Sequence, residues 1–214
     1  MPPHTGHTHE PHPFQPDHEE PASMESLLGT ALCDLLIEKG LWTADDERKQ
    51  IEVIDAITPA LGARVVARSW VDTDYHTRLM ANAFKAVEEL GIDAGYVEMT
   101  ALQNTDEVHN LVVCTLCSCY PRSLLGRPPT WYKSSVYRAR AVREPRKVLE
   151  EWGTSIASDR EVRVHDSTAE LRYIVIPMRP AGTDNWTEEE LARLVSRDSM
   201  VGVAEALSPD QLTG

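Results

Sequence analysis

Three cysteines within six residues are the side chains in this sequence best suited to chemistry. Cys114, Cys117 and Cys119 form the pattern C-x-x-C-x-C, which is short enough for three sulfur atoms to converge on one transition-metal ion. The backbone nitrogens of Ser118 and Cys119 can join them if deprotonated, as a strongly polarising trivalent ion allows. Five ligands leave one open position, and an open position on a Lewis-acidic metal is what catalysis needs.

Other uses of the same cysteines are a structural zinc site, an iron–sulfur cluster or reduced core thiols. Structural zinc takes four ligands, and the fourth could be His109 or His165, although neither forms a second pair with recognised zinc spacing. An iron–sulfur cluster also needs a fourth cysteine. The remaining cysteine, Cys33, lies far away in a predicted helix, where it is expected to pack. The spacing favours a dedicated three-cysteine site.

Helical patterns dominate the part of the chain that precedes this loop. Leucines recur at helical spacing from Met24 onward, and Gly40 is placed to end that helix. Further helix starts are indicated at Thr43 with Asp46, at Thr58 before Pro59, at Asp72 (whose helix would run toward Gly91), at Glu144 before Pro145, and at Thr187 with Glu190, the last clear helix.

Strand patterns surround the cysteine loop. Residues 96–102, 108–113, 161–165 and 171–176 read as strands, and the second of them leads directly into Cys114. Prolines and glycine at residues 120–129 predict an irregular stretch from the loop to the helix start at Glu144. The chain is therefore predicted to be α+β, with an N-terminal helical arm followed by a layered α/β metal-binding domain.

The composition changes along the chain, and four parts are predicted. Residues 1–23 are expected to be a disordered tail, and residues 24–92 a helical arm and helices. Residues 93–207 are expected to be the α/β catalytic domain with the three-cysteine metal loop, and residues 208–214 a C-terminal tail. The first part holds five of the eight histidines, which could capture metal ions or simply belong to a mobile polar tail: His4, His7, His9, His12 and His18.

Charge and hydropathy exclude several classes of protein. The formal net charge of −13 argues against a nucleic-acid binder, and no apolar run is long enough for a membrane span. Without the pattern of a signal peptide, a cytoplasmic protein is expected. Residues 120–150 are nevertheless basic, and they could meet an acidic partner or anionic ligand, or form a solvated face: Arg122, Arg127, Lys133, Arg138, Arg140, Arg143, Arg146 and Lys147.

The loop sequence VCTLCSC at residues 113–119 resembles the metal-binding motif of nitrile hydratase alpha subunits, and Thr115 matches the cobalt version of that motif. The resemblance covers most of residues 24–207. It continues in order through LG at 125–126, PP at 128–129, WYK at 131–133, VREPR at 142–146, RY at 172–173, MRPAGT at 178–183 and RDS at 197–199.

This resemblance implies one low-spin Co(III) per chain, held by Cys114, Cys117, Ser118 and Cys119. It further implies that Cys117 is oxidised to a sulfinate and Cys119 to a sulfenate, while Cys114 remains an axial thiolate. Cys119 and Ser118 would then be catalytic, in a hydro-lyase that converts a nitrile to an amide with cobalt as Lewis acid. The nucleophile would be the sulfenate oxygen or an activated water.

The same resemblance implies partners. The arm would wrap on a nitrile hydratase beta subunit, present as one chain or split into two, and the nitrile pocket would lie between the subunits. Arginines of that partner would bind the oxidised sulfurs, and an activator or metallochaperone is a further candidate partner. Two of the resulting heterodimers would then associate with each other.

Two departures from the family bear on substrate. Arg122 stands where many members have tryptophan, which suits a polar, heteroaromatic or anionic substrate; it could equally pair with an acidic group of the partner. The stretch 91–99 is shorter than a glycine-rich loop of many relatives. The alternatives are the three-subunit toyocamycin nitrile hydratase, the cobalt-binding subunit of thiocyanate hydrolase and, outside enzymes, a cobalt or zinc carrier.

Overall fold

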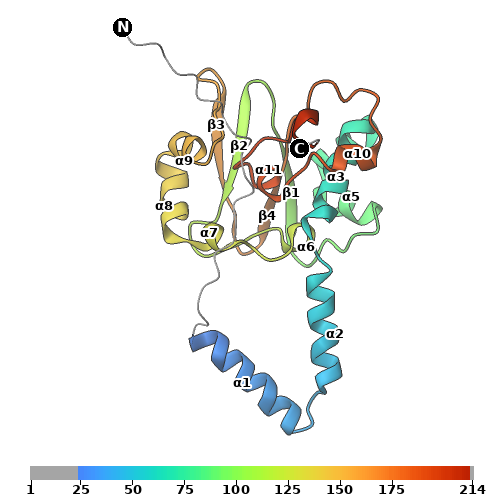
Figure 1. Cartoon of the computed structure of the whole chain (residues 1–214), viewed down its shortest axis with the longest axis vertical. Helices are drawn as coiled ribbons and strands as arrows, with labels where there is room; N and C mark the ends of the chain where they lie inside the picture. The colour runs from blue at the N-terminus through green and yellow to red at the C-terminus, as the bar shows by residue number, and fades with distance from the viewer. Residues whose placement is uncertain (1–23, 213–214) are drawn as a thin grey trace.

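The structure is a computed structural model that describes residues 24–212. The predicted His-rich tail at 1–23 lies outside these residues. Two helices, α1 (Met24–Glu38) and α2 (Ala44–Asp55), project from a body that contains all the strands (Figure 1). Thr43 caps α2 in the predicted capping box with Asp46. No described helix is long and apolar enough to cross a membrane.

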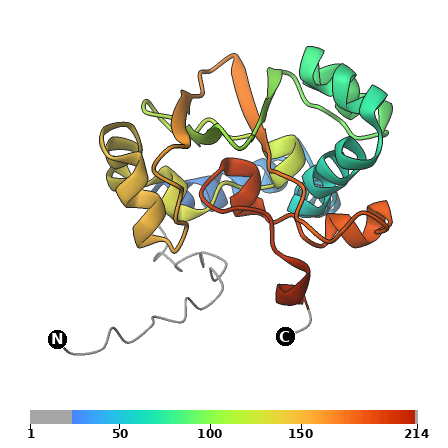
Figure 2. The ribbon, with the colours of Figure 1, turned by 90° about the horizontal axis from the view of Figure 1, so that it is seen from above.

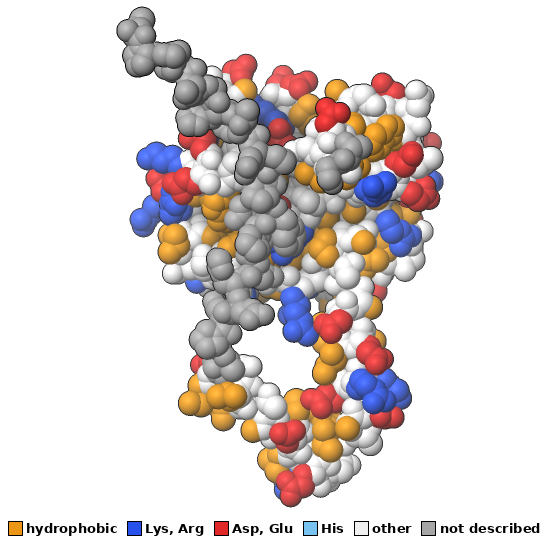
Figure 3. Space-filling view, in the orientation of Figure 1, with side chains coloured by type: hydrophobic (Ala, Val, Ile, Leu, Met, Phe, Trp, Pro, Cys, Tyr) orange, Lys and Arg blue, Asp and Glu red, His pale blue; other side chains and the backbone are white. Residues whose placement is uncertain are grey.

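The arm, α1 with α2, differs from the body in its burial. None of the residues that the structure describes in α1 or α2 is buried. Exposed apolar side chains of the arm lie among charged ones on the face that Figure 3 shows. Cys33 lies in α1, as expected, and is half-buried there.

Four strands form two parallel pairs in the body. β1 (Glu98–Gln103) pairs with β4 (Leu171–Ile176), and β2 (Val108–Val113) pairs with β3 (Glu161–Asp166). The predicted bounds of β2 and β4 are confirmed. β1 begins later than predicted, because Gly95 turns the chain with a positive φ of 84° and leaves Tyr96 fully exposed.

Helices pack on both sides of the strands, and Figure 2 shows the two groups apart. α3 (Pro59–Val71), α4 (Thr73–Ala81) and α5 (Ala83–Glu89) lie on the β1 side, whereas α8 (Ser135–Arg143) and α9 (Pro145–Glu151) lie on the β2 and β3 side. Between them, α11 (Arg197–Val201) contacts both β4 and β2. Its five residues are all buried, so it lies inside the core.

Three helix predictions are corrected. The helix expected from Asp72 toward Gly91 is two helices, because Asn82 leaves the helical region and its side chain accepts a hydrogen bond from the Lys85 amide at 3.0 Å. The stretch expected to be irregular contains α6 (Arg122–Leu125), α7 (Thr130–Lys133) and α8. The helix capped by Thr187, α10 (Glu188–Ala192), is followed by α11 and by a 3-10 helix, η1 (Pro209–Leu212), so it is not the last.

Candidate metal centre

β2 leads directly into the cysteine loop and fixes its first residue. Val112 and Val113 are buried in the core, and the Cys114 side chain that follows is 1% exposed. The Cys114 and Cys117 sulfurs are 3.5 Å apart, and the Cys117 and Cys119 sulfurs are 3.3 Å apart. All three lie within 4.8 Å of one another, so the loop presents three sulfur ligands to one small volume.

The loop is buried on one side and open on the other. Cys119 is 9% exposed, whereas Cys117 is exposed and Leu116 is 86% exposed. The Cys119 side chain therefore lies against the core, although it belongs to a loop. A ligand or partner can approach the cluster from the side of Cys117.

The cysteine thiols of the loop shift one another's pKa values. Hydrogen bonds from the Cys119 and Cys114 thiols and from the Ser118 amide lower the pKa of Cys117 to about 7. Burial, together with hydrogen bonds to the Cys117 and Cys114 thiols, raises the pKa of Cys119 to about 12. Cys117, the more exposed of these two sulfurs, thus ionises before Cys119.

Asp166, at the end of β3, holds the loop from the neighbouring strand. Its carboxylate accepts hydrogen bonds from the Thr115 amide at 2.9 Å and from the Thr115 hydroxyl at 2.5 Å. Sequence reasoning missed this residue, because only the pairing of Val113 with Asp166 brings the two segments together.

Aromatic residues support the loop from beneath. The Tyr132 hydroxyl donates to the Cys119 carbonyl at 2.8 Å, and the Tyr137 hydroxyl donates to the Val112 carbonyl at 2.7 Å. Both rings pack edge-on or tilted against Trp131 and against each other. Burial raises the pKa of both phenols, so they remain neutral donors that fix the backbone on either side of the cluster.

The two histidines considered as fourth ligands have other partners. His109 is fully buried and its Nε2 lies 2.8 Å from the Gly202 carbonyl oxygen, while His165 Nε2 lies 2.8 Å from Asn110 Oδ1. The ligand cluster found among residues 24–212 contains the three cysteines alone. A four-ligand structural zinc site is therefore not favoured by the described part of the chain.

Two arginines bear on the site from different elements. Arg122 follows Cys119 by three residues in the chain, begins α6 and is exposed. Arg172, on β4, was not singled out from the sequence, yet its positive charge acts to lower the pKa of Cys119 against the effect of burial. The effect of Arg172 on Cys119 could not be predicted from the sequence, because it depends on the order of the strands.

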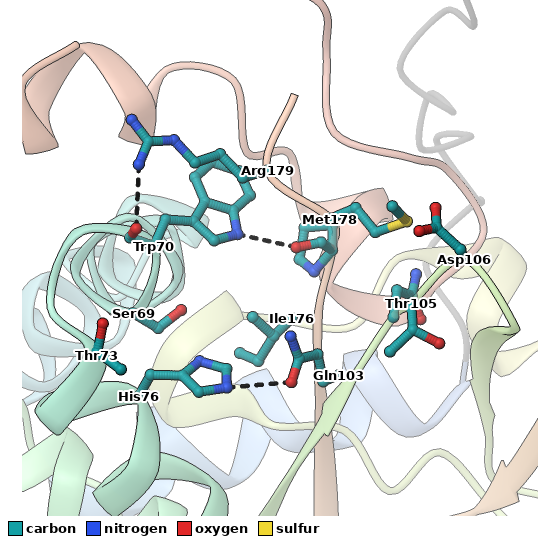
Figure 4. Close-up of a pocket in the computed structure, with 12 residues that line it drawn as sticks. Ser69, Trp70, Thr73, His76, Gln103, Thr105, Asp106, Ile176, Met178 and Arg179 are labelled. Atoms are coloured by element: carbon teal, nitrogen blue, oxygen red, sulfur yellow. Dashed lines mark hydrogen bonds between the residues drawn. The ribbon is translucent and has the colours of Figure 1, made fainter. Parts of the chain in front are cut away.

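A cavity lies at the end of the strands opposite the cysteine loop. About 420 Å³ in volume, it is lined by residues at the carboxyl ends of β1 and β4 and by α3 and α4 (Figure 4). His76 Nε2 lies 3.1 Å from Gln103 Oε1, and the Trp70 indole donates to the Pro177 carbonyl at 2.9 Å. The cavity contains none of the loop cysteines, since β2 runs from this end toward the cluster.

Known proteins match this arrangement over most of its length. The family described as "Nitrile hydratase, alpha chain" matches residues 23–204. The low-molecular weight cobalt-containing nitrile hydratase subunit alpha of Rhodococcus rhodochrous is 51% identical over 179 residues, 83% of this chain and 86% of that subunit. The thiocyanate hydrolase subunit gamma of Thiobacillus thioparus is 40% identical over 198 residues, 87% and 81% of the respective chains. A solved recombinant thiocyanate hydrolase with partially modified cobalt centres superposes with a TM-score of 0.80 at 39% identity, covering 87% of this chain and 92% of that one.

Proposed function

Because this chain belongs to the nitrile hydratase alpha-chain family, we propose that it is the metal-bearing subunit of a cobalt enzyme that hydrates nitriles to amides. The observation that carries the proposal is the convergence of three cysteine sulfurs within 4.8 Å on a loop buried at Cys114 and Cys119 and open at Cys117. A site closed on all sides would suit a structural ion, whereas this one leaves room for a substrate.

The residues present fit a trivalent ion that takes soft ligands. Cys114, Cys117 and Cys119 would supply three sulfurs, and the amide nitrogens of Ser118 and Cys119 would supply two further ligands. When bound, cobalt would supply Lewis acidity toward a nitrile nitrogen. The name of the Rhodococcus rhodochrous relative includes cobalt, and Thr115 agrees with that metal, so cobalt is the ion we propose, one per chain.

We further propose that Cys117 is a sulfinate and Cys119 a sulfenate in the active protein. Sulfinate formation adds two oxygen atoms to a thiolate, as one dioxygen molecule supplies, and sulfenate formation adds one, as a peroxide supplies with loss of water. Exposure of Cys117 gives an oxidant access to the more highly oxidised sulfur. The added oxygens are acceptors that need donors, which arginines of a partner subunit would provide.

In the proposed reaction, one water is added across the carbon–nitrogen triple bond. The two candidate nucleophiles are the oxygen carried by Cys119 and a water held beside it. In either case the chain's task is to keep Cys119 and Ser118 fixed, which the Tyr132 hydroxyl does by donating to the Cys119 carbonyl at 2.8 Å. A site positioned in this way needs little rearrangement as charge develops during the reaction.

Arg122 supports a polar or heteroaromatic nitrile, including a nucleoside nitrile, as the preferred substrate. It is exposed three residues after Cys119, and a planar guanidinium can both donate hydrogen bonds and stack. The second candidate function, thiocyanate hydrolysis, is favoured by the same cation and by the 40% identical relative. Nitrile hydration is preferred because the nitrile hydratase relative is 51% identical.

The test is turnover by the cobalt-loaded chain assembled with a beta subunit, present as one chain or two. Amide formation from 3-cyanopyridine, with at least about tenfold lower activity on thiocyanate, supports the proposal. The reverse preference would establish the second candidate. An activator or metallochaperone that loads the metal is expected if cobalt added to the purified chain is not incorporated.

A metal carrier would behave differently from either enzyme. It should keep Cys117 and Cys119 as reversible thiolates, because a carrier has to release its ion. The mass of the peptide that contains both cysteines distinguishes the ideas: three added oxygen atoms in all support the hydratase, and an unmodified peptide from fully metal-loaded protein contradicts it.

A further inference from the structure

A groove beside the cysteine loop is formed by one face of α8. It has a volume of about 320 Å³ and is lined by Thr115 of the loop together with Ser135, Arg138, Ala139, Val142 and Arg143. The five α8 residues follow the spacing of a single helix face. Val142 is 51% exposed and Arg143 is exposed, so the groove opens to solvent immediately next to the metal loop.

The charges on this face of α8 are not balanced within the described chain. Neither Arg138 nor Arg143 has a carboxylate within 4.0 Å among the described residues, whereas Arg140, on another face of the same helix, bonds Glu144 at 2.6 Å and Glu151 at 2.7 Å. The positive charge of α8 is therefore neutralised at Arg140, whereas Arg138 and Arg143, which line the groove, keep theirs.

Arg138 carries a second observation that points to a missing partner. Its Nε atom is buried and has no hydrogen-bond partner in the described chain, while its Nη1 donates to the Thr115 carbonyl at 3.3 Å. A buried donor without an acceptor is unfavourable, because it has lost its hydrogen bond to water without gaining another. A carboxylate seated in the groove would accept from this atom and at the same time meet the charge of Arg143.

We propose that the α8 groove docks an acidic side chain, flanked by apolar residues, of the subunit that pairs with this chain; the inference rests on the proposed function for the identity of that subunit. A small anion would satisfy the arginines but would leave Val142, Val136 (64% exposed) and Leu116 (86% exposed) in water. A protein segment covers both kinds of surface. Its position beside the open flank of Cys117 makes it continuous with the surface where a substrate pocket would form.

Docking at this groove would also position the metal loop. The partner's carboxylate would hold the Arg138 guanidinium, which donates to the Thr115 carbonyl, and Thr115 is held from the other side by Asp166. Arg138 is in this account a positioning residue that links subunit assembly to the geometry of the loop. Arg140, which is neutralised within α8, has no such link.

The experiment measures the dissociation constant between the cobalt-loaded chain and its beta subunit at two salt concentrations. Arg138→Gln combined with Arg143→Gln is expected to weaken binding by about 30-fold or more and to remove most of its salt dependence. Arg140→Gln is the matched control, which removes the same charge from the same helix and is expected to change binding less than about threefold. Thermal unfolding of each variant alone separates binding from folding.

The visible absorption of the bound metal tests whether Arg138 positions the metal loop. This absorption should shift in Arg138→Gln at saturating beta subunit. Arg138→Lys should restore the affinity more fully than the absorption, because lysine keeps the charge without the planar donor. Unchanged affinity in the double variant would overturn the proposal. Two other results would also overturn it. A higher affinity for the beta subunit after deletion of residues 1–23 would assign the groove to that segment of the chain itself. Loss of self-association in the double variant would assign the groove to a second copy of the chain.

Failure of this inference differs from failure of the proposed function. If the chain binds its partner through α8 but forms no amide, the docking stands and the hydratase does not. If amide forms with full activity in the double variant and affinity is unchanged, the hydratase stands and the docking does not.

Discussion

The metal loop and the N-terminal arm differ in what holds each of them in place. Around the loop, Cys114 and Cys119 are buried, and the Tyr132 and Tyr137 hydroxyls hold the backbone on either side. In the arm, no described residue of α1 or α2 is buried, and leucines are left in water. Because apolar burial is the main stabilising contribution to folding, packing within the body stabilises the loop backbone, whereas the described residues of the arm gain little from such packing.

The largest expected effect is on activity, and it sets the loop against the arm directly. Cys119→Ala should lower amide formation by at least about 10³-fold, since losing one ligand removes several kcal/mol of transition-state stabilisation. The free energy of unfolding should change by only about 1 kcal/mol. Cys33→Ala in the arm is the control and should retain activity. Turnover by a metal-loaded Cys119→Ala protein at the wild-type rate would remove the proposed mechanism.

Two glycines sharpen the comparison through stability. Gly202, after α11, has a φ of +87°, and an added Cβ would lie 1.9 Å from the Asn110 carbonyl oxygen. Gly202→Ala should therefore lower the free energy of unfolding by about 3 kcal/mol or more. Gly29, in α1, has nothing within 4 Å of an added Cβ, so Gly29→Ala should stabilise the helix by about 0.5–1 kcal/mol. Chemical denaturation measures both, and equal effects would contradict the contrast.

Leucines of the arm should affect assembly more than folding. Leu28 and Leu32 are 62% and 56% exposed, whereas Leu149 in α9 is fully buried. Replacing both arm leucines by serine should weaken binding to the beta subunit by about 100-fold and change the stability of the isolated chain by less than about 0.5 kcal/mol. Leu149→Ala should cost about 3 kcal/mol of stability. Undiminished binding by the arm variant, measured by calorimetry, would show that the arm has another role.

The smallest expected effect is a pH dependence that belongs to the body. Burial lowers the pKa of His109 below its ordinary value of 6.5. As pH falls below about 6.5, the unfolded chain takes up a proton that the folded chain refuses, so stability is lost with acidification. His109→Gln should flatten this dependence by about 1 kcal/mol between pH 7.5 and 5.5. Parallel curves for wild type and His109→Gln would contradict the assignment.

Local patterns in the sequence predicted the parts that depend on neighbouring residues. The cysteine spacing, the capping box of Thr43 with Asp46 and the strand that leads into Cys114 all act within a few residues, and the structure contains each of them. The convergence of the three sulfurs is of the same kind, because the ligands come from one loop.

Features that depend on pairing between distant segments could not be predicted. Asp166 reaches Thr115 only through the register of β3 with β2, and Arg172 comes near Cys119 only because β4 lies where it does. α8 was missed for a local reason. The prolines before it indicated an irregular chain and concealed Ser134, whose side chain accepts from the Tyr137 amide at 3.1 Å and starts the helix.

The most direct test of the central claim is the metal content of the chain purified after growth with cobalt, iron and zinc all supplied. We predict about one cobalt per chain, and loss of that cobalt in Cys119→Ala while the fold is retained. Stoichiometric zinc in the wild-type protein would contradict the account in favour of a structural or carrier site. Stoichiometric iron would show that the loop is a hydratase site with the metal wrongly assigned from Thr115.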